Sequence, residues 1–158
     1  MAHTGWWRRL GNTVAVIFVM AVLGNYPWEL VQAPLYVGMT SVRGAWWHCF
    51  VASLGDGLLV LGIFAIGWLV LRRPMWFVHP GILGYAVMVV VGLVMGVTIE
   101  WVAVHVLGRW MYTARMPRLP GLDVGIVPVI QMLVLPPLIL RGVAAWHHRM
   151  VIRREELV

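Results

Sequence analysis

Residues 80–107 read PGILGYAVMVVVGLVMGVTIEWVAVHVL, and this stretch decides what kind of fold the chain can adopt. Glu100 is its single acid, and it contains neither Lys nor Arg. A helix that crosses the hydrocarbon core of a bilayer needs about 20 mostly apolar residues. Pro80 is well suited to the first turn of a helix, because its missing N–H is not needed there. The stretch therefore predicts a membrane-spanning helix.

Three other apolar stretches have the same character, at residues 13–33, 46–71 and 124–140. The chain of 158 residues is 61% hydrophobic and only 11% charged, with a mean hydropathy of +0.86. A soluble domain carries roughly 25% charged residues and could not hide this much apolar surface in one core. Since repeats and linkers are also lacking, the sequence predicts one all-α domain, residues 1–158, built as a bundle of four transmembrane helices.

The first apolar stretch has a second interpretation as a signal peptide, because Arg8 and Arg9 precede it. No clear cleavage site between small residues follows, and the apolar character continues to Leu35. We therefore expect a retained first helix.

The arginines predict the orientation of the bundle. Eight fall on one side of the four-span topology and four on the other, at positions 8, 9, 72, 73, 141, 149, 153 and 154 against 43, 109, 115 and 118. Positively charged residues favour the cytoplasmic side. Both termini are therefore expected in the cytoplasm. Most of the ten tryptophans support the same borders, because aromatic rings prefer the headgroup layer; those near predicted span ends are Trp6, Trp7, Trp28, Trp46, Trp47, Trp76, Trp110 and Trp146.

Three acids lie inside the apolar stretches, namely Glu29, Asp56 and Glu100. A carboxylate at membrane depth is costly unless it is protonated, paired or solvated. Gln32 and Gln131 are the amides at similar depth. The four-span topology places all five in the outer half of the membrane, and the inner halves contain no comparable group.

This arrangement predicts a cavity with acid–base chemistry. The candidate catalytic residues are Glu100, Asp56, Glu29 and His48, the last as a proton relay at the mouth. The candidate ligand-binding residues are Gln32, Gln131, Arg109, Trp110 and Tyr112. We expect the side chains of Glu29, Asp56, Glu100 and Gln131 to approach one another.

Other interpretations of these residues stay open. The polar groups could instead hydrogen-bond one another and only hold the bundle together. Arg109 could pair with Glu100, contact a lipid headgroup, or extend to the interface as such arginines commonly do. His105 does not share a helix face with Glu100 and is expected to be a bystander. His79, His147 and His148 are expected at the surface.

Several classes of function lack support in the sequence. The net charge is +6, but no basic helix is long enough to follow a phosphate backbone, which excludes nucleic acid as a partner. Cys49 is the only cysteine, so neither an intrachain disulfide nor a thiolate cluster can form. No zinc-protease, phosphate-loop or serine-hydrolase motif is present. The sequence identifies no cofactor and no set of metal ligands.

Several short motifs resemble those of a group of small bacterial four-helix integral membrane proteins to which no function is assigned. They extend from residue 28 to 137, and they comprise Trp28-Glu29 with Gln32, Pro34-Leu35-Tyr36, His48-Cys49, Gly55-Asp56, Glu100, Arg109-Trp110 with Tyr112, Met116-Pro117, and Pro128 with Gln131. The resemblance supports this choice of site residues and nothing further about function. We expect a multi-pass protein of the bacterial cytoplasmic (inner) membrane.

Three functions compete on this basis. The first is an enzyme that uses acid–base chemistry, such as isomerisation or cyclisation, on a lipid-soluble small molecule. The second is an accessory or scaffold subunit that binds a membrane-protein partner or a second copy of itself. The third is a carrier of protons or of a divalent metal ion. In each case the lipid bilayer is the surrounding partner.

Overall fold

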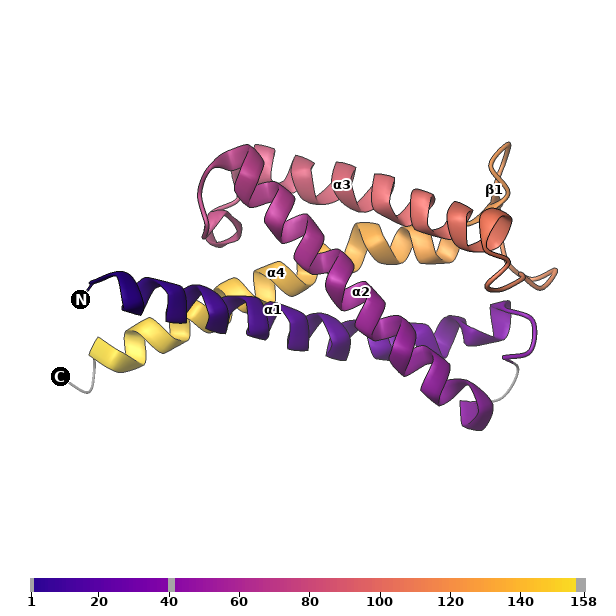
Figure 1. Ribbon diagram of the computed structural model, residues 1–158, viewed down its shortest axis with the longest axis horizontal. Helices are drawn as coiled ribbons and strands as arrows, with labels where there is room; N and C mark the ends of the chain where they lie inside the picture. Colours follow the sequence, from indigo (N-terminus) through magenta and orange to yellow (C-terminus); the bar gives the residue numbers. More distant parts are fainter. Residues whose placement is uncertain (1, 40–41, 156–158) are drawn as a thin grey trace.

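The computed structural model describes residues 2–39 and 42–155, and four long helices dominate it (Figure 1). These helices are α1 (Ala2–Gln32), α2 (Val42–Leu71), α3 (Gly81–Trp101) and α4 (Ile126–Glu155). The shorter elements are the 3-10 turns η1 (Ala33–Leu35) and η2 (Trp76–Val78), the π-helical turn η3 (Val102–Val106), and the strands β1 (Arg118–Leu119) and β2 (Val124–Gly125). The two strands form an antiparallel hairpin in which Arg118 pairs with Gly125.

All four helices are long and apolar enough to cross a membrane, which confirms the predicted four-helix membrane bundle. The spans are Trp6–Leu35, Gly44–Leu71, Gly81–Val106 and Ile126–Arg149. Large apolar side chains such as Leu58 and Ile82 lie on their outer surfaces, 62% and 89% exposed, as lipid-facing residues do.

Two boundaries differ from the predicted spans. The first helix begins well before residue 13, and the fourth continues beyond residue 140 to Glu155. A helix need not end where its apolar stretch ends, because its own hydrogen bonds continue into the polar flank. Helix α4 also continues without interruption through Pro136 and Pro137.

The chain ends of the described bundle lie together at one end, and the first and third connections lie at the other (Figure 1). At this second end the backbones of the two connections pair as an isolated antiparallel bridge between Tyr36 and Tyr112. Val37 N donates to Met111 O at 2.9 Å, and Thr113 N donates to Leu35 O at 2.9 Å. The bridge ties α1 to the segment that follows α3.

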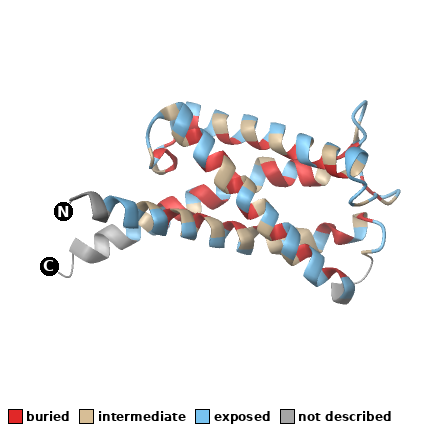
Figure 2. Cartoon of the chain, viewed as in Figure 1, coloured by how far each residue is buried: buried red, intermediate tan, exposed pale blue. Residues whose placement is uncertain are grey.

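The main apolar core lies in the half of the bundle nearer the termini, while buried residues follow the inner sides of the helices along the whole bundle (Figure 2). Trp76 lies within this core and is only 1% exposed. Its ring stacks over Gly67, and its Nε1 donates to the backbone oxygen of Phe64 at 3.0 Å. The assignment of Trp76 to an interfacial belt is therefore wrong, because its N–H finds a backbone partner inside the bundle.

The histidines of the C-terminal half divide between core and surface. His79 and His148 are exposed, as expected. His147 is half-buried instead, because its Nε2 lies 3.1 Å from Oγ1 of Thr13 across the α1–α4 contact. The expectation that His147 is a surface residue is therefore wrong.

Helix α3 packs on α4 through a face of small residues. Gly92 and Gly96 are buried against Met132 of α4, Gly84 lies further along the same side of the helix against Trp76, and this side ends at Glu100. A methyl group added at Gly92 would overlap the backbone carbonyl of Met132. Small residues allow helices to approach closely in membranes, so this face sets the depth and rotation at which Glu100 meets α4.

We expect Gly92→Ala to lower the free energy of unfolding by about 1–3 kcal/mol, as overpacked sites generally do. Gly11→Ala is the matched control, because nothing lies within 4 Å of an added methyl group there; it should be neutral or slightly stabilising. Thermal unfolding of the purified proteins in detergent tests both changes. Equal melting temperatures for the two variants would contradict the proposed close contact.

Candidate functional site

One face of α1 supplies three polar side chains to the interior. Asn25, Glu29 and Gln32 are spaced by four and three residues, which aligns them along a single helix face. Asn25 and Gln32 are buried, and Glu29 is partly buried. Asp56 reaches the same place from α2 and Gln131 from α4.

The carboxamide of Gln131 is the centre of this network. Its Nε2 lies 2.8 Å from Oδ1 of Asn25, 2.9 Å from Oε1 of Glu29 and 2.9 Å from Oδ2 of Asp56. Its Oε1 accepts a hydrogen bond from Nε2 of Gln32 at 3.0 Å. A single side chain thus joins α4 to α1 and α2.

Hydrogen counting indicates how protons are placed in the network. The Nε2 group of Gln131 has two hydrogens but three acceptors within reach. Glu29 Oε1 also accepts a hydrogen bond from Nε2 of Gln32 at 2.6 Å. The carboxyl groups of Glu29 and Asp56 each lie 2.9 Å from Nε2 of Gln131. Two carboxyl groups so close together in a site without bulk water are not both ionised, so the pair holds a proton.

Glu100 forms a separate part of the site, on α3. It is 7% exposed, and its Oε2 accepts hydrogen bonds from the Tyr112 hydroxyl at 2.5 Å and from Trp110 Nε1 at 3.3 Å. The ion pair considered between Arg109 and Glu100 is not formed. Among the described residues the only ion pair is Arg118–Asp123, on the surface.

The π-helical turn explains how Trp110 and Tyr112 return to Glu100. In η3 the N–H of Leu107 bonds to the carbonyl of Val102 five residues earlier, at 2.9 Å. This widens the helix directly after Glu100 and ends it, so the chain folds back over the carboxyl group. Such turns are common at functional sites. His105 lies on η3, is exposed and does not border the site, as expected.

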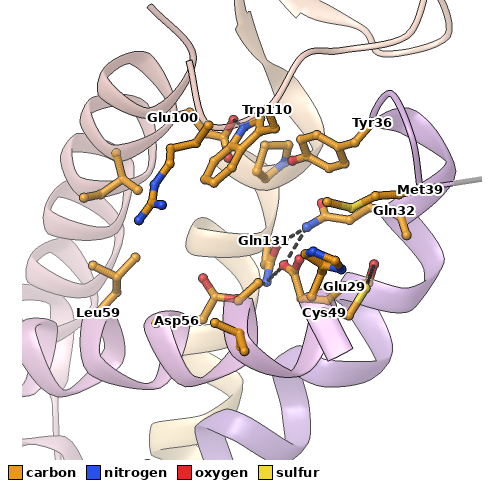
Figure 3. Close-up of a pocket in the computed structure, with 18 of the residues that line it drawn as sticks. Glu29, Gln32, Tyr36, Met39, Cys49, Asp56, Leu59, Glu100, Trp110 and Gln131 are labelled. Atoms are coloured by element: carbon orange, nitrogen blue, oxygen red, sulfur yellow. Dashed lines mark hydrogen bonds between the residues drawn. The ribbon is translucent and has the colours of Figure 1, made fainter. Parts of the chain in front are cut away.

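A cavity of about 610 Å³ separates the two parts of the site. Glu29, Asp56 and Gln131 lie along one side, and Glu100 with Trp110 lies across from them (Figure 3). Cavities that bind small molecules have volumes of about 300–1,000 Å³. This space is therefore large enough for a ligand.

The cavity brings together eight of the nine candidate residues. The candidate residues that line it are Glu29, Gln32, His48, Asp56, Glu100, Arg109, Trp110 and Gln131. Tyr112 does not line it but holds Glu100 from behind. The predicted meeting of polar side chains is confirmed for Glu29, Asp56 and Gln131. Glu100 lies across the cavity from them and makes no hydrogen bond to any of the three.

The sequence reasoning missed some residues of the site, among them Asn25 and Tyr36. Asn25 is fully buried beneath Gln131 and was recognisable, since it precedes Glu29 by one helical turn. Tyr36 lines the cavity and packs against Trp110 with ring centres 6.2 Å apart. No local pattern marks Tyr36, because it reaches the site through the bridge between two connections.

The network leaves one acceptor free. Gln32 is 3% exposed, and both hydrogens of its Nε2 are used, but its Oε1 has no partner.

Within residues 2–39 and 42–155, no three His, Cys, Asp or Glu side chains gather closely enough to hold a metal ion. The cavity therefore offers hydrogen-bond acceptors and proton-carrying groups. Comparison with protein-family models, curated proteins and solved structures finds no match for the chain.

The phenols of Tyr36 and Tyr112 lie just outside the membrane spans, and burial raises the pKa of each above the ordinary value of 10.0. The Glu100 carboxyl group adds to the rise in both pKa values. Both phenols therefore stay protonated throughout the physiological range, and Tyr112 remains a donor to Glu100. The pKa of each phenol is higher in the folded protein than in the unfolded chain. The stability that the two neutral phenols contribute to the fold is therefore lost only as pH rises above about 10.

We expect the double variant Tyr36→Phe/Tyr112→Phe and the unchanged protein to show the same rise in phenolate absorbance between about pH 7 and about pH 10.5. The control is the same titration after denaturation, where the unchanged protein should show a larger rise because two more phenols ionise. A smaller rise for the native double variant would show that these phenols titrate normally.

Proposed function

We propose that this protein is a membrane-embedded enzyme that moves protons on a lipid-soluble small molecule, in an isomerisation or cyclisation. One observation carries the proposal. A cavity within the membrane spans has two neighbouring carboxyl groups, Glu29 and Asp56, on one side and a third carboxyl group, Glu100, on the other. Groups with acid and base roles set apart by their surroundings are the usual parts of such chemistry.

The reaction needs no further reagent. The Glu29–Asp56 pair gives its proton to a carbon of a double bond, and a neighbouring carbon becomes cationic. Glu100 then removes a proton from an adjacent carbon, and the electron pair of that C–H bond forms the new double bond. Transfer of a proton from Glu100 back to the pair, through His48 or water at the mouth, restores the starting state. Each proton that leaves a carboxyl group is thus replaced.

Aromatic rings around the cavity suit a cationic intermediate. Tyr36, Trp47 and Trp110 all line it. The face of an aromatic ring attracts a cation, and the attraction grows when water is excluded. The paired connections at Tyr36 and Tyr112 lie at this end of the bundle and hold the Tyr112 hydroxyl against Glu100.

A purely structural role explains less of what is seen. Side chains that only join helices need to satisfy one another and leave no cavity. Here a cavity of about 610 Å³ remains, and Gln32 Oε1 stays without a partner inside the network. A buried acceptor without a partner costs about 1–3 kcal/mol. That cost is understandable where a ligand supplies the missing donor.

For location, the proposal is the bacterial cytoplasmic membrane with both termini in the cytoplasm. Arg8, Arg9, Arg72, Arg73 and Arg149 lie in the parts of α1, of the second connection and of α4 that meet at the end of the bundle holding the termini. The opposite end, with fewer arginines, contains the cavity. Positive residues on the cytoplasmic side favour this orientation, which puts the cavity in the outer half of the membrane.

We expect Glu100→Gln, Asp56→Asn and Glu29→Gln each to lower the rate at least about 100-fold, the scale of a lost general acid or base. Each change keeps the shape of the side chain and removes its ability to carry a proton. The measurement compares lipid extracts of cells that carry or lack the gene, in search of a pair of isomers whose ratio depends on it. Thermal stability of each purified variant shows that the fold is kept.

Asp123→Asn is the matched control, because Asp123 is an exposed carboxylate paired with Arg118 and lies away from the cavity. It should leave the isomer ratio unchanged. A stable Glu100→Gln variant with full activity would return Glu100 to a structural role and refute the proposed chemistry.

Orientation is tested with single cysteines in a Cys49→Ser background. Arg115 and Arg149 are both exposed, and they lie at opposite ends of the bundle. A membrane-impermeant maleimide applied to intact cells should label Arg115→Cys and leave Arg149→Cys unlabelled until the membrane is broken. The reverse pattern would invert the proposed orientation.

A further inference from the structure

The cavity has two kinds of border, and they differ in polarity. Toward the connections it meets His48, Arg109 and Trp110. Along the membrane it meets apolar or small residues of α2 and α3, including Val51 and Ile99, which are 48% and 44% exposed. Side chains that both line a cavity and face outward mark a place where the cavity opens to its surroundings.

The arrangement of α2 and α3 explains this opening. The two helices lie close together near η2 and diverge toward the end that holds the cavity (Figure 1). Ala52, Gly55 and Leu59 of α2 face the cavity on this side, opposite Gly96 and Ile99 of α3. Because both helices are membrane spans, an opening between them leads into lipid.

The carboxyl and carboxamide groups of the cavity wall supply hydrogen-bond acceptors, and the Arg109 guanidinium supplies donors. Oε1 of Gln32 is buried and has no partner, and the carboxyl groups of Glu29 and Glu100 present oxygen atoms. A ligand that satisfies Gln32 must donate a hydrogen bond. A hydroxyl group or an amine meets that requirement, whereas a ketone or an ether does not.

Charge distinguishes between these two donors. Arg109 lies on the cavity wall, and no carboxylate in the described part of the chain forms an ion pair with it. The carboxyl groups would attract an ammonium group, but it would also face this guanidinium and would lose its hydration among apolar side chains on the way in. A neutral hydroxyl group avoids both costs.

We infer that the ligand of this cavity is a long-chain lipid alcohol that enters from the bilayer between α2 and α3 and donates its hydroxyl hydrogen to Oε1 of Gln32. The inference names the substrate class for the site and rests on the proposed function for its catalytic meaning. The apolar chain lies toward the opening, and the hydroxyl group lies beside Glu29.

Binding is measured with tritiated farnesol on the full-length protein in detergent, with farnesyl methyl ether and farnesylamine as unlabelled competitors. We expect farnesol to bind at least about ten-fold more tightly than the ether, which corresponds to about 1.4 kcal/mol. The amine should compete less well than farnesol. Equal affinities for farnesol and the ether would overturn the assignment of a donor, and tighter binding of the amine would replace the alcohol by a cation.

Gln32→Leu tests which residue reads the hydroxyl group. The ratio of ether to farnesol dissociation constants should fall to about one in this variant, whereas a general loss of structure would weaken both ligands alike. A ratio that stays at about ten would show that Gln32 does not receive the hydroxyl group.

The opening is tested by filling it. Nothing lies within 4 Å of a Cβ atom added at Gly55, which lines the cavity, so we expect Gly55→Phe to place its ring in the opening. Ala52→Phe gives a second plug at an exposed lining position. Leu58→Phe is the control, because Leu58 is 62% exposed on the same helix but does not line the cavity.

Both plugs should reduce farnesol binding at least about ten-fold with melting temperatures near that of the unchanged protein, and Leu58→Phe should not. Full binding by both stable plug variants would refute entry between α2 and α3. Since these measurements record binding alone, they separate the two proposals. Farnesol that binds as expected to a protein with no isomerase activity would support the ligand class and count against the proposed chemistry.

Discussion

In the hydrocarbon core of a bilayer a carboxyl or carboxamide group finds no water, so each one must meet a partner within the protein. Here one side chain satisfies that requirement for three helices. Gln131 of α4 contacts Asn25 and Glu29 of α1 and Asp56 of α2 through a single nitrogen. The positions of α1, α2 and α4 around the cavity all depend on this meeting point.

The rest of the bundle accommodates the polar site without competing with it. Apolar packing around Trp76, Phe77 and Met88 fills the half nearer the termini and leaves the polar residues to the other half. The glycine face of α3 brings Glu100 close to α4, and the bridge between the connections brings Tyr112 onto Glu100. One half of the bundle thus contributes most of the apolar packing, and the other half of the same helices holds the polar site.

The sequence was sufficient for the four spans and for most of the residues around the cavity. Both follow from local signals: long apolar stretches, and acids where acids are costly. It could not supply the partner of Glu100, because Tyr112 arrives through a π-helical turn that no residue pattern announces. Arg109 was one possible partner by charge, whereas two neutral donors, Trp110 and Tyr112, occupy that place. The burial of Trp76 depended on a backbone acceptor on another helix, and sequence alone does not show such an acceptor.

The position of Gln131 on the last helix has a consequence for the making of the protein. Helices enter the membrane in the order of synthesis, so α1 and α2 are present before α4. Until α4 arrives, Asn25, Glu29 and Asp56 lack the amide that joins them. An incomplete chain therefore exposes unsatisfied polar groups within the membrane, a mark by which cellular quality control can distinguish it from the finished bundle.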